Sequence, residues 1–108
     1  MITPEWVNRI YDNYLEALGA LQKTYLEWED AKEGYEIAVY LATIEGRIVG
    51  KNEAERDACA YNQCESEYRV EVATRRAYTL AKHEFALAQV EVDRIGVLMA
   101  LPVVEKVS

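Results

Sequence analysis

Five acidic side chains crowd one stretch of the N-terminal half and could do metal chemistry: Glu27, Glu29, Asp30, Glu33 and Glu36. Clustered carboxylates can hold two iron ions in a helical bundle, but that chemistry needs Glu-x-x-His pairs on facing helices. The chain has one histidine, His83, and the residue three positions before it is Leu80. We therefore expect no metal site. We interpret the acidic cluster as a solvated face, with imitation of nucleic acid or docking on a basic partner as the alternative.

The two cysteines, Cys59 and Cys64, are the other reactive side chains. Five positions apart on a helix they point about 140° away from each other, which excludes a disulfide between them. A zinc site would need further Cys or His residues nearby. No serine or cysteine nucleophile stands in a recognisable motif with His83, so we expect no catalytic residue, no cofactor and no enzyme activity.

Aromatic residues are the most unusual feature, because eight tyrosines occur in 108 residues. We interpret most of them as amphipathic core or interface residues whose hydroxyl groups reach the rim. The alternative is a cleft where an aromatic ligand or partner side chain stacks. The candidate interface residues are Tyr11, Tyr14, Tyr25, Trp28, Lys32, Tyr35, Tyr61, Tyr68, Tyr78 and Phe85.

A long helix over about residues 4–45 must position the first of these side chains. Thr3 before Pro4 is typical of a helix start, with threonine as N-cap and proline at the first helical position. Apolar residues then recur every three or four positions, with Lys32 as a cation that we expect to fix register rather than add stability. Flanking apolar residues widen this stripe to a face suited to three or four helices. The stripe comprises Val7, Tyr11, Tyr14, Leu18, Leu21, Tyr25, Trp28, Lys32, Tyr35, Val39 and Ala42, flanked by Ile10, Leu15, Leu26, Ala38 and Leu41.

A turn over residues 46–51 reverses the chain. Gly46 follows the first helix, at a position where a left-handed residue is cheapest for glycine, and Gly50 gives a second permissive position. Asn52 is a predicted N-cap with Glu55 at the third helical position, the asparagine form of a capping box. A stop, a short loop and a start predict a helical hairpin.

The second helix is predicted over about residues 52–101. Its apolar stripe falls into two pieces, and Thr74–Arg76 breaks the phase between them, so the helix either bends there or changes partner. Pro102 is expected to end the helix and to leave 102–108 as a short extended tail. The two pieces are Tyr61, Cys64, Tyr68, Val72 and then Tyr78, Ala81, Phe85, Ala88, Val92, Ile95, Met99.

Composition limits the partners. A chain of 108 residues is one domain, and 51% apolar residues exceed what a lone hairpin can hide, so we expect self-association into a dimer or higher oligomer. The net charge of −7 disfavours direct binding to a DNA or RNA backbone. No apolar run reaches the roughly 20 residues that span a bilayer, and the N-terminus lacks signal-peptide features. We expect a soluble, cytoplasmic protein without membrane contacts.

The segment Gly50-Lys51-Asn52, followed after three intervening residues by Arg56, resembles, together with the helices around it, small helical-hairpin proteins of bacteriophages and prophages. The resemblance covers roughly residues 35–100. It implies a phage accessory protein acting in the host cytoplasm, and it supplies no catalytic residues. The chain departs from the pattern through its two cysteines and through Thr74–Arg76.

Together these features predict an all-α fold: a long antiparallel helical hairpin that self-associates into a bundle. The predicted function is that of a small acidic interaction protein that modulates a host or phage protein, for example a defence or nucleic-acid-handling enzyme. One alternative is a small-molecule binder or sponge with tyrosine-lined clefts between subunits. A second alternative is a structural coiled-coil component of a phage assembly.

Overall fold

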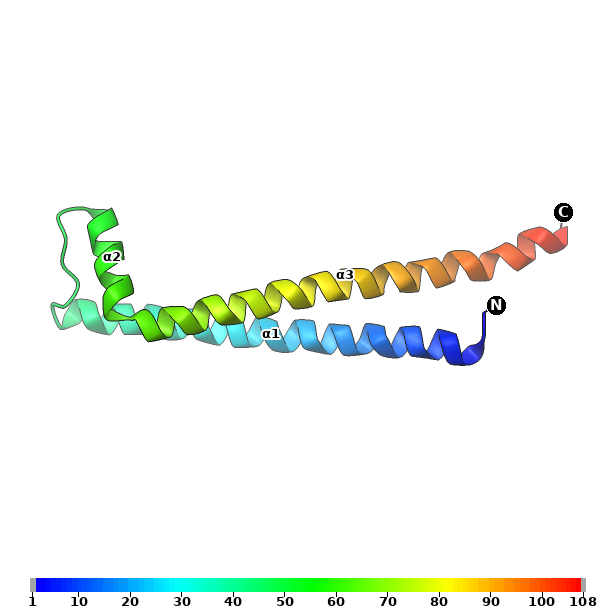
Figure 1. The fold of residues 1–108 in the computed structure, drawn as a ribbon, viewed down its shortest axis with the longest axis horizontal. Helices are drawn as coiled ribbons and strands as arrows, with labels where there is room; N and C mark the ends of the chain where they lie inside the picture. Colours follow the sequence, from blue (N-terminus) through cyan, green and yellow to red (C-terminus); the bar gives the residue numbers. More distant parts are fainter. Residues whose placement is uncertain (1, 108) are drawn as a thin grey trace. The chain divides into compact units, whose positions relative to one another are not determined.

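A computed structural model describes residues 2–107, and the side chains of residues 2–100. The described chain is helical throughout apart from its loop and ends, and residues 2–107 contain no strand. The helices are α1 (Pro4–Ile44), α2 (Glu53–Gln63) and α3 (Glu65–Val107) (Figure 1). The all-α prediction is therefore confirmed.

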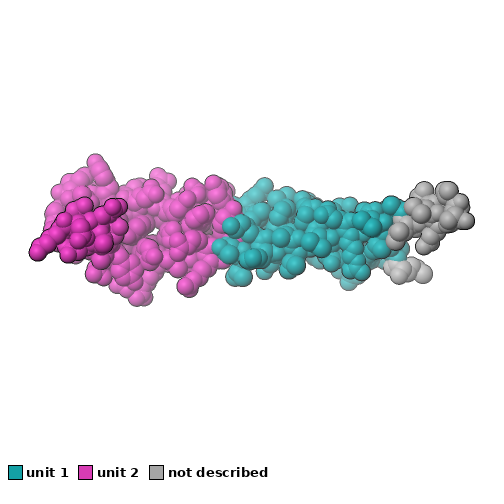
Figure 2. Space-filling model, turned by 90° about the horizontal axis from the view of Figure 1, so that it is seen from above, with its two compact units in different colours: residues 1–23, 79–108 teal, residues 24–78 magenta. Residues whose placement is uncertain are grey.

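The chain forms two compact units, and α1 and α3 contribute to both. Unit 1 comprises residues 1–23 and 79–108, and unit 2 comprises residues 24–78 (Figure 2). In unit 2, Tyr25 contacts Tyr78 and Tyr35 contacts Tyr68, so the two helix segments run antiparallel there. The predicted helical hairpin is confirmed, while self-association and a single domain over residues 1–108 stay predictions.

The ends of α1 are fixed by local chemistry. The Trp6 N–H donates to Thr3 Oγ1 (3.1 Å), which confirms the threonine cap. At the other end Gly46 has φ +74°, and the Arg47 N–H donates to the Ala42 carbonyl (2.9 Å). With the Gly46 N–H donating to Thr43 O (3.1 Å), these bonds form a Schellman motif. One helix thus runs from Pro4 to Ile44, close to the predicted 4–45.

The turn is held against the start of α2. The Glu55 N–H donates to Asn52 Oδ1 (2.9 Å), and Glu55 Oε2 accepts from the Lys51 N–H (2.7 Å). This confirms the predicted cap, although the carboxylate bonds Lys51 rather than Asn52 itself. A Cβ on Gly50 would lie 2.7 Å from the Arg56 backbone nitrogen, so glycine is required there by space rather than by a positive φ.

Asn52→Ala is expected to lower the free energy of unfolding by about 1 kcal/mol, because the Glu55 N–H would lose its acceptor at a helix terminus. Urea denaturation followed by circular dichroism measures the change. Asn52→Asp, which keeps an acceptor oxygen at the same place, is the matched control and should stay near the wild-type value. Equal losses for both variants would show that the cap does not stabilise α2.

The predicted second helix over 52–101 is wrong at Cys64, where it divides into α2 and α3. Cys64 has φ −121° and ψ 36°, outside the helical range, and α2 turns away from the line of α3 (Figure 1). Ala60 and Cys64 are buried at this bend. Their small side chains allow close approach of the backbones, while Asn62 and Cys64 are weak helix formers.

Two further details of this helix differ from the prediction. The helix does not break at Thr74–Arg76. The side of α3 that meets α1 continues through this segment, but some of its positions are polar, so the apolar pattern is interrupted while the helix is not. The least exposed positions of this side are Cys64, Tyr68, Glu71, Thr74, Tyr78, Ala81 and Phe85. It also passes Pro102 and ends at Val107 instead of leaving an extended tail. A proline removes one backbone hydrogen bond and can kink a helix without ending it.

Candidate interaction surfaces

Unit 2 is held together by an aromatic row between its helices. Tyr78 stacks on Trp28 (ring centroids 5.4 Å apart) and meets Tyr25 at 5.5 Å. Tyr68 meets Tyr35 at 5.4 Å and Tyr61 of α2 at 4.9 Å, both edge to face. These are the preferred geometries of aromatic pairs, each worth about 0.5–1.5 kcal/mol beyond the area that it buries.

The sequence-predicted interface residues are thus brought together within one chain. Six of them form the aromatic row, and Tyr14 pairs with Phe85 in unit 1 at 5.3 Å. Tyr11 is separate from these pairs and 44% exposed. An intermolecular role for the paired rings stays a prediction.

Tyr35 of the aromatic row is packed against Tyr68. Burial raises the pKa of its phenol above the ordinary value, and the neighbouring Cys64 and Tyr68 add to the effect. The phenol is therefore neutral at pH 7.

Lys32 lies at the edge of the row and is paired. Its Nζ is 2.8 Å from Glu29 Oε1 and 4.2 Å from the centre of the Trp28 ring. The hydrogen bond with Glu29 is the main reason that the pKa of Lys32 is raised. Its side chain is 36% exposed, so this cation is anchored over an aromatic ring without being buried.

Glu71 is a buried carboxylate that the predicted apolar stripe of the second helix did not include. It is 8% exposed, and its Oε1 accepts a hydrogen bond from Trp28 Nε1 (3.4 Å). Among described residues its Oε2 has no hydrogen-bond partner, and the Arg75 guanidinium is 3.7 Å away. Glu71 and Arg75 thus form an ion pair four residues apart in which Glu71 lies inside the helix contact. The signal in the sequence was the spacing Tyr68, Glu71, Thr74, Tyr78.

The outer side of α1 in unit 2 carries an apolar stripe without cover. Among residues 2–100 only six apolar side chains are buried, while seventeen large apolar ones are exposed. Five of the exposed ones repeat at helical spacing along α1, and we call them the α1 face. They are Leu26, Ile37, Tyr40, Leu41 and Ile44.

A groove of about 410 Å³ runs along unit 2 beside this stripe. Three carboxylates and three small or apolar residues line it. Gly34 contributes no side chain to the lining, and a Cβ there would have nothing within 4 Å. The lining residues are Glu27, Asp30, Ala31, Gly34, Glu67 and Val70.

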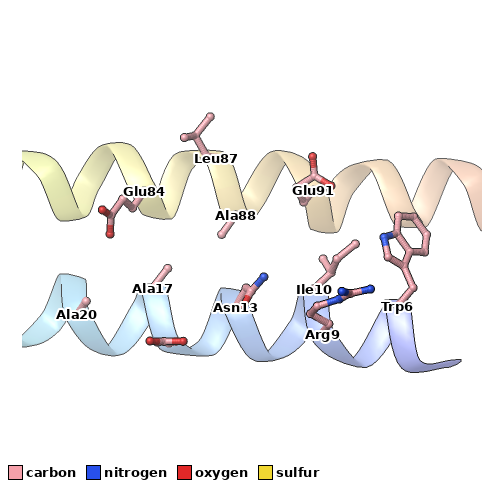
Figure 3. A pocket seen from close by; sticks show the side chains of 11 residues that line it. Trp6, Arg9, Ile10, Asn13, Ala17, Ala20, Glu84, Leu87, Ala88 and Glu91 are labelled. Carbon is pink, nitrogen blue, oxygen red and sulfur yellow. The ribbon is translucent and has the colours of Figure 1, made fainter. Parts of the chain in front are cut away.

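Unit 1 has its exposed stripe on α3 and a larger groove, of about 660 Å³, between α1 and α3. Alanines form much of the groove, with Trp6, Arg9 and Ile10 at one end. Figure 3 shows Ala88 directed toward α1 and Leu87 directed away from it. In unit 1, α3 therefore packs against α1 with the side that carries Ala88, and it exposes the side that carries Leu87.

The described residues contain no group of three or more His, Cys, Asp or Glu side chains that could hold a metal ion. Both cysteines are free, and Cys59 Sγ donates to the Arg47 carbonyl (3.2 Å) in the turn. None of the helices over residues 2–100 has an apolar stretch able to cross a bilayer. The described residues instead offer exposed apolar stripes and grooves.

No family model, curated protein or solved structure matches this chain.

Proposed function

We propose that this protein is a non-catalytic interaction protein, which self-associates through its helices and docks on another protein. The observation that carries the proposal is an imbalance in apolar burial. Among residues 2–100, six apolar side chains are buried, whereas seventeen large apolar side chains are exposed. Apolar surface of this extent in contiguous stripes is typical of surfaces that bind other proteins. The buried area of a lone hairpin is small for independent stability.

The α1 face is the proposed docking surface for the partner. Asp30 and Glu33 lie between Leu26 and Ile37 along the helix, and Glu67 of α3 stands across the groove. The net charge of the chain, −7, is also negative. A partner that presents apolar side chains flanked by lysine or arginine complements both properties. The resemblance to phage hairpin proteins favours a host enzyme that handles nucleic acid, because such enzymes have basic surfaces.

A synthetic amphipathic helix of leucine and lysine is a direct probe of this surface. Fluorescence anisotropy of the labelled peptide should show binding that weakens with salt, whereas a leucine–glutamate peptide should not bind. Ile37→Ser should weaken binding about tenfold through lost apolar contact. Leu15→Ser removes an apolar α1 side chain of comparable exposure (62%, against 51% for Ile37) from unit 1 and is the matched control.

Equal binding by Ile37→Ser, Leu15→Ser and the wild type would mean that the peptide responds to net charge alone, and the α1 face would lose its role. Self-association is tested separately by sedimentation equilibrium at low micromolar concentration. A single folded species of 12.4 kDa would contradict it.

A further inference from the structure

The outer stripe of α3 in unit 1 is built for contact with another helix. Leu80, Leu87, Val90 and Val97 are between 59% and 68% exposed. Their steps of seven, three and seven residues are the a and d positions of a heptad, the spacing that keeps one seam in contact along a pair of helices. A different set of positions, including Ala81 and Ile95, is buried. We call these four residues the α3 face.

We propose that the α3 face binds the α3 face of a second copy, antiparallel, about a two-fold axis between residues 88 and 89. Two helices in this register place Leu87 against Val90 of the second copy, and Leu80 against its Val97. Each of the four residues then meets another member of the same set. This inference rests on the self-association proposed above and assigns it a surface and a direction.

The polar residues of the same seam favour the antiparallel direction. His83 and Arg94 occupy the heptad positions between the apolar ones, and in this register each faces the other across the axis. A neutral imidazole can accept a hydrogen bond from a guanidinium. A parallel pair would instead stack Arg94 on its own copy, which is repulsive.

Flanking charges support the same register. Glu84 lies next to Arg94 of the second copy, and no ion pair between described residues uses either side chain within the chain. Glu84 also comes near Glu91 of the second copy. Arg94 of that copy, three residues beyond its Glu91, stands between the two carboxylates and offsets their repulsion.

Cysteine cross-linking tests the direction of the pair. Leu80→Cys and Val97→Cys proteins are oxidised separately and as a mixture, and peptide mass spectrometry identifies the joined residues, because Cys59 and Cys64 remain in the chain. The proposal predicts an 80–97 disulfide in the mixture alone. Two copies of residue 80 would be about 25 Å apart, beyond the reach of a disulfide. Disulfides 80–80 and 97–97 in the separate samples would overturn the antiparallel register.

Charge insertion tests the surface itself. Leu87→Glu should raise the dimer dissociation constant about 100-fold, roughly tenfold for each of the two symmetry-related leucines. Leu26→Glu, at 62% exposure against 68%, is the matched control on the α1 face and should leave the constant unchanged. Circular dichroism checks that both variants keep their helices.

The outcomes separate this inference from the proposed self-association. A wild-type dimer that survives Leu87→Glu, or that is lost with Leu26→Glu instead, overturns the α3 face and leaves self-association intact. A wild-type protein that stays monomeric contradicts both.

Discussion

Tyr68→Ala is expected to lower the free energy of unfolding by about 3 kcal/mol. Among the side chains of residues 2–100, Tyr68 is the one ring that contacts both α1, through Tyr35, and α2, through Tyr61. Truncation of a buried aromatic residue costs about 3–5 kcal/mol, and Tyr68 is half-buried, so the low end applies. The expected loss of about 3 kcal/mol includes the contributions of the two ring pairs. Urea denaturation monitored by circular dichroism gives the change.

Two comparison variants give this prediction its control. Tyr68→Phe keeps the ring and should retain most of the stability. Tyr40→Ala removes a tyrosine that is 65% exposed on the α1 face and should change stability by less than about 0.5 kcal/mol. If Tyr68→Ala were no more harmful than Tyr40→Ala, the aromatic row would not be what holds unit 2 together.

The turn could be predicted from sequence because its determinants are local. Gly46, Asn52 and Glu55 act on backbone groups within five residues of themselves, so their spacing in the sequence already specifies the bonds that they make. The start of α1 at Thr3 is of the same kind. The break at Cys64 has no such signal. The Tyr61 and Tyr68 rings, on either side of the break, meet edge to face, whereas periodicity alone continues a helix through it.

The contact face of the hairpin was harder to predict, because each helix carries more than one apolar stripe. The broad stripe expected on α1 divides in the structure: Ile10 is buried, whereas Leu15 and Leu26 are 62% exposed. Residues on both stripes repeat at helical spacing, and the repeat does not say which stripe meets α3. Glu71 was missed for a related reason. A hydrophobic pattern counts every glutamate as polar, so it does not distinguish one at a contact position from the solvated glutamates around it.

The largest backbone effect is expected at Gly50, where Gly50→Ala should lower the free energy of unfolding by about 2 kcal/mol. A Cβ there would meet the Arg56 nitrogen at 2.7 Å and the Glu55 Cβ at 2.8 Å, inside the first turn of α2. Backbone atoms of a capped helix cannot move aside as a flexible side chain can. The turn must therefore shift, and such overpacking costs about 1–3 kcal/mol.

The same substitution at Gly19 should have the opposite sign. Gly19 lies inside α1, and a Cβ there would have nothing within 4 Å. Alanine should therefore raise stability by about 0.5–1 kcal/mol, because glycine loses more backbone entropy in a helix. Thermal and urea denaturation of both variants measure the pair. Two changes of the same sign would contradict the close approach of Gly50 to α2, and with it the steric reason for a glycine before Lys51 and Asn52.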